Sequence, residues 1–157
     1  MAVSVKRITL WRKEVENTPG VLADVLEPLA RAGADLQVVM GYRFPGNESR
    51  AAIELYPVSG KKSVAAAEEA GLSASSIPTL LVEGDNRPGL GHAIASAIAD
   101  AGINLGFLVT QVVGERYTSV IGFETEEEAS RAATLIKRAK PAKQAGQKAS
   151  QKKGGKK

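Results

Sequence analysis

An internal repeat limits the folds open to this chain more than any other property of its sequence. Residues 17–36, NTPGVLADVLEPLARAGADL, align without gaps with residues 86–105, NRPGLGHAIASAIADAGINL, at an offset of 69. Seven positions are identical, and they include Asn-x-Pro-Gly at the start and Ala-x-Ala-Gly near the end. Composition alone would give two alanine-rich helices some matching alanines. It would not place Asn-x-Pro-Gly and Ala-x-Ala-Gly at the same separation in both segments. The sequence therefore predicts two copies of one structural unit.

The first copy has the pattern of a strand, a helix, a hairpin and a second helix. Residues 5–15 have the β-branched and aromatic content of a strand. Pro19 suits the first turn of a helix, and Gly33 suits its end in the left-handed conformation. The other elements expected in this copy are strands over 36–42 and 51–55 and a helix over 61–70.

The second copy repeats this order but ends early. Its last helix is expected to begin with a capping box formed by Thr125 and Glu128. No β-forming segment follows Arg138, so the closing strand of the second copy is either missing or supplied from elsewhere. The segment 73–82 either closes the first unit and opens the second or belongs mainly to the second. The expected elements before the last helix are a strand over 77–82, a helix over 90–101 and a hairpin of 103–113 with 117–123.

This order of elements predicts an α+β fold in which helices cover one face of each antiparallel sheet. We expect a first domain over residues 1–76 and a second over 77–139. An uncovered sheet edge at the missing closing strand would invite pairing with a second copy, so a homodimer is expected.

The net charge of the chain is concentrated at its C-terminal end. Residues 1–139 hold 14 Lys and Arg against 17 Asp and Glu, whereas residues 140–157 hold seven Lys and no acid. The latter segment has no Val, Leu, Ile or aromatic residue to bury, which predicts a disordered basic tail. Such a tail either attracts nucleic acid or anionic membranes weakly or is simply solvated.

Composition also excludes several functions. The chain has no Cys and a single His, which rules out thiol chemistry, iron–sulfur clusters and multi-histidine metal sites. The sequence Gly89-Leu90-Gly91 lacks the third glycine of a dinucleotide fingerprint, since Ile94 stands in its place. We therefore expect no catalytic residues, no metal and no cofactor. Few aromatic residues make nucleic acid an improbable partner, and the lack of a signal or membrane-spanning segment predicts a cytoplasmic protein.

Four short segments give the chain a resemblance to a known family. VENTPG at 15–20 and EGDNRPGL at 83–90 each lead into a helix, and the helices are followed by AGAD at 32–35 and AGIN at 101–104. These segments resemble the ACT domain family, which consists of small regulatory modules of ferredoxin-like βαββαβ topology. The resemblance extends over nearly all of residues 3–138. It implies two ACT units in tandem that bind a free amino acid between paired domains.

The Pro-Gly turn at each helix start is the expected ligand site. Unpaired N–H groups and the positive end of the helix dipole suit an α-carboxylate, and glycine permits close approach. By the resemblance, Asp35 or Asn104 would receive the ammonium group or fix the carboxylate. The competing interpretation is that the polar residues only cap the helices. The candidate ligand-binding residues are Asn17, Thr18, Gly20, Val21 and Asp35 in the first copy and Asp85, Asn86, Arg87, Gly89, Leu90 and Asn104 in the second.

The sequence thus predicts a non-enzymatic, amino-acid-binding regulatory or sensor protein that engages a protein partner. Two alternatives stay open. The chain is either a structural interaction module without a working ligand site or a weak binder of anionic polymers through its lysine-rich tail.

Overall fold

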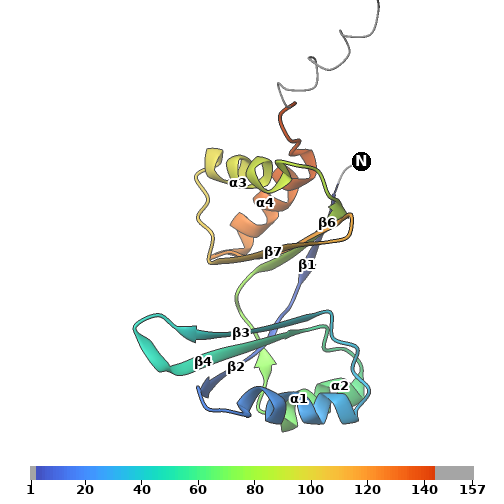
Figure 1. Ribbon diagram of the computed structural model, residues 1–157, viewed down its shortest axis with the longest axis vertical. Coiled ribbons are helices and arrows are strands. Elements are labelled where there is room, and N and C mark those ends of the chain that lie inside the picture. Colours follow the sequence, from blue (N-terminus) through green and yellow to red (C-terminus); the bar gives the residue numbers. More distant parts are fainter. Residues whose placement is uncertain (1–2, 144–157) are drawn as a thin grey trace, which may run out of the picture.

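The computed structural model describes residues 3–143, which form two α+β units (Figure 1). The first unit has the sheet order β3-β4-β2-β5 and the second has β1-β6-β8-β7, and all pairings are antiparallel. The elements of the first unit are β2 (Trp11–Glu16), α1 (Val21–Arg31), β3 (Val38–Phe44), β4 (Asn47–Tyr56), α2 (Lys61–Glu69) and β5 (Ser73–Ala74). Those of the second unit are β1 (Ser4–Ile8), β6 (Thr79–Asp85), α3 (Leu90–Asp100), β7 (Phe107–Val113), β8 (Arg116–Gly122) and α4 (Glu126–Arg138).

The α+β class and the helix on one face of each sheet are confirmed. Left-handed glycines end α1 and α3 one residue beyond their C-caps, with φ of 73° at Gly33 and 69° at Gly102. The capping box at α4 is also present, because Thr125 Oγ1 accepts from the Glu128 amide and the Glu128 carboxylate accepts from the Thr125 amide. These local patterns therefore form as the residues predict.

The continuous strand expected over residues 5–15 was wrong, because the structure divides it between the two sheets. β1 pairs with β6 from Ser4↔Glu83 to Ile8↔Thr79, whereas β2 pairs with β4 and β5. Two residues outside any strand join them, and the second of these, Leu10, is fully buried. Both halves combine β-branched or aromatic residues with Lys and Arg, so their composition does not indicate which sheet each half joins.

β1 supplies the closing strand that the second copy lacks. It lies beside β6, which is the place that β5 takes beside β2 in the first unit. Arg7 on β1 is also ion-paired with Glu126 on α4, and its Nε donates to Glu126 Oε2 at 3.1 Å. Residues 4–8 thus share a sheet with 79–122, across the expected domain boundary at residue 76. The edge that suggested a homodimer is therefore already occupied.

The segment 73–82 serves both units, as the first of its two expected interpretations predicts. β5 pairs with β2 through Trp11↔Ala74 and Arg12↔Ser73, and β6 then opens the second sheet. The chain thus passes between the units twice, once between β1 and β2 and once between β5 and β6.

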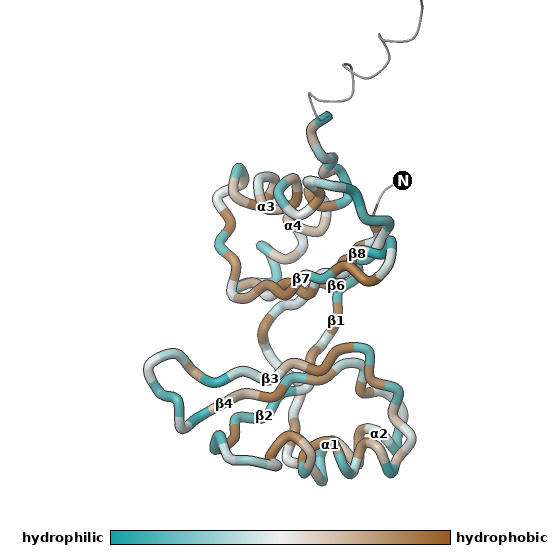
Figure 2. The backbone as a smooth tube through the Cα atoms, viewed as in Figure 1, coloured by the Kyte–Doolittle hydropathy of each residue, from teal (hydrophilic) through white to brown (hydrophobic). Residues whose placement is uncertain are grey.

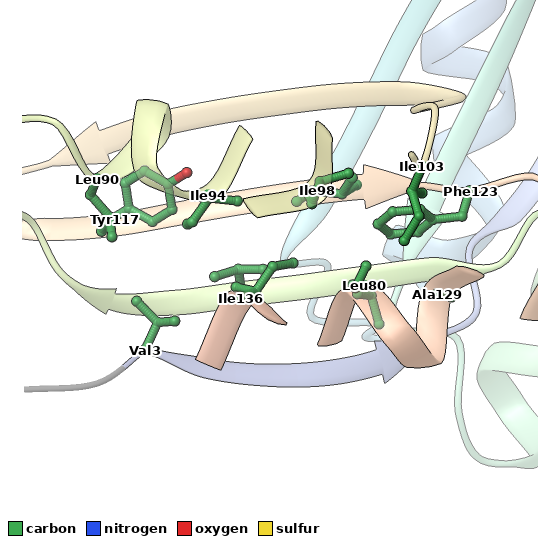
Figure 3. Packing of buried hydrophobic residues seen from close by; sticks show 13 residues of the cluster. Val3, Leu80, Leu90, Ile94, Ile98, Ile103, Tyr117, Phe123, Ala129 and Ile136 are labelled. Carbon is green, nitrogen blue, oxygen red and sulfur yellow. The ribbon is translucent and has the colours of Figure 1, made fainter. Parts of the chain in front are cut away.

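Each unit has its own apolar core between its sheet and its helices. Figure 3 shows the second core, where Leu80 of β6 and Ile136 of α4 lie among the apolar side chains of α3 and β8. The first core includes Val25, Leu29 and Leu55. The helices of both units lie on the outside and the two sheets face each other (Figure 1). A third cluster, built on Ile8, Leu10, Leu81 and Val120, lies between the sheets.

The basic tail predicted over 140–157 lies outside the described residues from 144 onward. Its described part, residues 140–143, follows α4 without regular secondary structure. Within residues 3–143, no helix combines the length and the apolar character needed to span a membrane.

Candidate functional site

The two helix entrances, residues 17–21 and 86–90, have matching backbones. The N-cap of α1 is Gly20, with φ of 89° and ψ of −11°, and the N-cap of α3 is Gly89, with φ of 84° and ψ of 0°. Glycine adopts this left-handed conformation without steric cost. Each helix therefore begins one residue after the glycine, and the preceding prolines lie outside it.

Neither entrance has a side-chain cap, so the competing interpretation, that their polar residues only cap the helices, is wrong. Leu90 N donates to Arg87 O at 3.1 Å and Ala93 N to Gly89 O at 3.0 Å. Among the hydrogen bonds of the described residues, none satisfies the amides of Gly91 and His92. The same holds for Leu22 and Ala23 at the start of α1. Helix α2 also lacks a side-chain cap at Gly60, but that glycine is not left-handed.

The polar residues of the entrances instead fasten the loops to neighbouring strands. The backbone N–H of Asn17 donates to Ser49 O at 2.8 Å, and its side-chain Nδ2 donates to Glu48 O at 3.1 Å. Asn86 donates from its amide to Glu115 O at 2.8 Å. These contacts hold each loop against a β-hairpin, so the free helix amides have a fixed direction.

The remaining entrance residues hold the loop or pack into the cores. The carbonyl of Thr18 accepts from Val21 N at 3.3 Å. Asp85 forms an ion pair with Arg116, with 2.9 Å between Oδ1 and Nη1. The side chains of Val21 and Leu90 pack against the first and second cores respectively.

The two entrances differ in what lies beside them. A Cβ atom placed on Gly20 would meet no atom within 4 Å, so the first entrance is open. A Cβ atom on Gly89 would lie 3.6 Å from Cβ of Pro141, because the chain after α4 passes in front of the second entrance. A cavity of about 290 Å³ lies there, which we call the basic cavity. It is lined by Val3, Asp85, Arg87, Leu90, Lys137, Ala139, Lys140 and Pro141.

Asp35 and Asn104 do not join the entrances within one chain. Both are exposed and follow the C-terminal ends of α1 and α3. Each helix has 11 residues, which corresponds to a length of about 16 Å. One small ligand cannot touch the entrance and the far end of the same helix. Asp35 and Asn104 could therefore meet only an entrance of another unit, not that of their own helix.

A buried ionisable cluster on the sheet of the first unit was missed from the sequence. Glu54 is fully buried, accepts a hydrogen bond from Tyr42 Oη at 3.1 Å and has Oε1 3.7 Å from Nε of Arg12. Burial raises the pKa of Glu54, although the Tyr42 hydrogen bond and the charge of Arg12 oppose this. Arg12 and Met40 are the cross-strand neighbours of Glu54, and the three residues form one row across the first sheet. The corresponding row of the second sheet is apolar and consists of Leu81, Val120 and Val109. A lone Glu in an apolar strand gives no sequence signal for such a cluster.

A cleft of about 250 Å³ lies between the sheets, and its lining includes Val38, Met40, Leu81 and Glu83 but none of the predicted site residues. Among residues 3–143, no three His, Asp or Glu side chains gather closely enough to hold a metal ion.

The fold and the paired entrances define a two-unit α+β protein in which the first helix of each unit, α1 or α3, begins at a left-handed glycine. The sequence matches no protein-family model and no curated protein. Protein BT0572 from Bacteroides thetaiotaomicron has a similar structure, with a TM-score of 0.68 at 13% identity over 83% of this chain and 88% of that one.

The regulatory subunits of aspartate kinase from two Thermus species share the same architecture. The ligand-free Thermus thermophilus subunit gives a TM-score of 0.58 at 20% identity, covering 88% of this chain and 97% of that one. The Thermus flavus subunit gives 0.57 at 19% identity, covering 88% and 96%. This chain therefore has an ACT-like fold.

Proposed function

We propose that this protein is a non-enzymatic regulator that binds a free amino acid at its helix entrances and passes the signal to a protein partner. The observation that carries this proposal is the pair of uncapped entrances, each of which leaves two helix amides free. Amides at a helix start bind carboxylates through hydrogen bonds and the helix dipole. The α-carboxylate is common to all free amino acids, so both entrances suit this class of ligand.

Two other observations support the proposal. The second entrance opens onto the basic cavity, which gives a ligand a concave site as well as free amides. The regulatory subunits of aspartate kinase have the same fold, which is consistent with regulation. The proposal includes no catalytic step, metal or cofactor, and it assigns the protein to the cytoplasm. A domain boundary at residue 76, between β5 and β6, stays a prediction, and residues 4–8 join the sheet beyond it.

We also propose that the protein is a homodimer, paired along β7 rather than along the closing strand. β7 lies at the edge of its sheet and has no charged residue among its seven. Edge strands usually carry charges that prevent pairing. Leu108, Val109, Val112 and Val113 are 44% to 65% exposed, and Figure 2 shows the hydrophobic character of this strand. Antiparallel pairing of two β7 strands about a two-fold axis would place each of the four beside a side chain of the partner strand.

A homodimer would also complete the ligand site. Asp35 and Asn104 are separated from the entrances of their own units by a helix length, so in this proposal a second chain brings them to an entrance. This arrangement makes ligand binding and dimerisation interdependent.

A thermal-shift screen of the proteinogenic amino acids tests ligand binding. A ligand at about 100 times its Kd adds about 2.7 kcal/mol to the free energy of unfolding. We expect at least one amino acid to raise Tm in the full chain, and Gly20→Val combined with Gly89→Val to abolish the effect. If none raises Tm, an interaction module without a ligand site becomes the better explanation.

Val112→Arg tests the homodimer. The residue at the corresponding position of β3, 69 residues earlier, is Arg43, so the variant gives β7 the charge that the first unit already has. We expect a dimer for the original chain and a monomer for the variant by light scattering at micromolar concentration. Leu22→Arg places the same charge at another exposed apolar residue, on α1 (39% exposed against 46% for Val112); it is the control and should leave the mass unchanged. A monomer in the original chain would contradict the proposal.

A further inference from the structure

The basic cavity exists because the closing strand of the second unit comes from the N-terminus. In the first unit, the chain after α2 turns inward: Leu72 is buried in the core and residues 73–74 form β5. In the second unit, β1 already occupies that place beside β6. The chain after α4 therefore cannot enter the sheet, and residues 139–141 run past the start of α3 instead. They form a wall of the basic cavity.

The side chains around this cavity carry an excess of positive charge. Arg87, Lys137 and Lys140 line it, and none of the ion pairs among the described residues involves them. The acidic side chain in the lining, Asp85, is paired with Arg116 at 2.9 Å. The three cations are thus available to a ligand, in addition to the free amides of α3.

The corresponding positions of the first unit carry no positive charge. The second helices of the two units end at Glu69 and Arg138, so the offset of 69 still holds there. At this offset the counterparts of Arg87, Lys137 and Lys140 are Thr18, Glu68 and Gly71. The basic character therefore belongs to the second entrance alone.

We propose that the basic cavity binds a small dicarboxylate, with one carboxylate at the start of α3 beside Arg87 and the other at Lys137 and Lys140. A volume of about 290 Å³ suits a small metabolite rather than a polymer. Because this inference rests on the proposed function, it selects the acidic amino acids, aspartate and glutamate, as the ligands of the second entrance. The first entrance has no counterpart of the basic residues and takes no part in this preference.

Isothermal titration of the full chain at fixed ionic strength tests the inference with L-glutamate, L-glutamine, L-aspartate, L-asparagine and succinate. We expect each acidic amino acid to bind about tenfold more tightly than its amide, which is the size of effect that two partly exposed charge contacts produce. Equal affinity for acid and amide would overturn the inference while leaving the proposed function intact. No binding of any of these four amino acids would overturn the inference, and the proposed function is contradicted only if the thermal-shift screen of all proteinogenic amino acids is negative as well.

Succinate has two carboxylates but no ammonium group, so it distinguishes a general dicarboxylate site from a site that recognises an amino acid. Binding of succinate as tight as that of L-aspartate would support a dicarboxylate site and contradict recognition of an amino acid. Weaker binding of succinate would support both proposals, because the ammonium group would then contribute.

The variant Lys137→Glu with Lys140→Gly gives the cavity the residues of the first unit. We expect it to lose the preference for glutamate over glutamine while Tm changes little, since both lysines are exposed. Lys152→Glu with Lys153→Gly makes the same change of charge in the tail and should keep the preference. Arg87→Thr is a second, independent variant and should weaken glutamate binding. A preference that survives the first variant or is lost in the tail control would overturn the inference.

Discussion

The two units have the same helix entrances but close their sheets with strands from different parts of the chain. The first unit is closed by β5, the segment that directly follows α2, whereas the second is closed by β1, which precedes the whole first unit. This exchange leaves the segment after α4 free to cover the second entrance. Duplicated sequence therefore does not imply duplicated sites, because the environment of a repeated motif depends on which segment completes each sheet.

Deletion of residues 1–8 should have the largest effect, because it removes the closing strand of the second unit and leaves that of the first unit in place. The deletion removes β1 and exposes the edge of β6, and it removes the buried side chains of Val3 and Ile8. Burial of two such side chains contributes roughly 3–6 kcal/mol. We expect a loss of this order in urea unfolding, together with faster hydrogen exchange in residues 79–85. Deletion of 144–157 is the control, and unchanged exchange in β6 would show that β1 is not its closing strand.

Gly20→Val and Gly89→Val compare the two entrances directly. Both glycines are left-handed, so each substitution should cost about 1–2 kcal/mol in backbone strain, as measured by chemical denaturation. The effects on ligand binding should differ, because the basic cavity lies beside Gly89 alone. We expect glutamate affinity to fall in Gly89→Val and to stay unchanged in Gly20→Val. Equal losses of affinity would mean that the two entrances bind alike.

Glu54→Gln sharpens the contrast between the charged row of the first sheet and the apolar row of the second. Because the pKa of Glu54 is raised in the folded state, the folded state holds its proton more tightly than the unfolded state. Stability in the original chain should therefore fall as pH rises above the usual value of 4.5. Glu54→Gln lacks this fall in stability. The Tm of the variant minus the Tm of the original chain should therefore be more positive at pH 7 than at pH 4.5.

Glu14→Gln is the matched control for that experiment and should respond with the opposite sign. The hydrogen bond from Arg12 lowers the pKa of Glu14, so this contribution to stability is present at pH 7 and lost as pH falls. The Tm of Glu14→Gln minus the Tm of the original chain should therefore be more negative at pH 7 than at pH 4.5. The same sign for both variants would contradict the assignment of the buried cluster.

Arg7→Gln should have the smallest effect, and it tests whether β1 is held against α4 of the second unit. Arg7 lowers the pKa of Glu126 through a hydrogen bond and its charge. We expect the pKa of Glu126, measured by NMR titration of its side-chain carboxyl carbon, to rise toward the usual value of 4.5. A pKa that stays low would show that another group holds this carboxylate.

Local features of this protein could be predicted from residues close together in the chain. The glycines at 33 and 102 and the pair Thr125 and Glu128 determine helix ends through backbone conformation and one or two hydrogen bonds. The exchange of β1 could not be predicted in this way, because its pairing with β6 depends on the competition between two distant sheets for one apolar segment. The basic cavity escaped prediction for the same reason: Arg87 and Lys140 meet only once β1 has taken the place of a C-terminal strand.

The place of β1 also bears on how the chain is synthesised. Every strand of the first sheet lies between β1 and β6 in the sequence. On a ribosome the first sheet is thus complete before the partner of β1 has emerged. β1 therefore waits unpaired while the first sheet emerges, and a chaperone that shields such a strand would act on residues 4–8 of this protein.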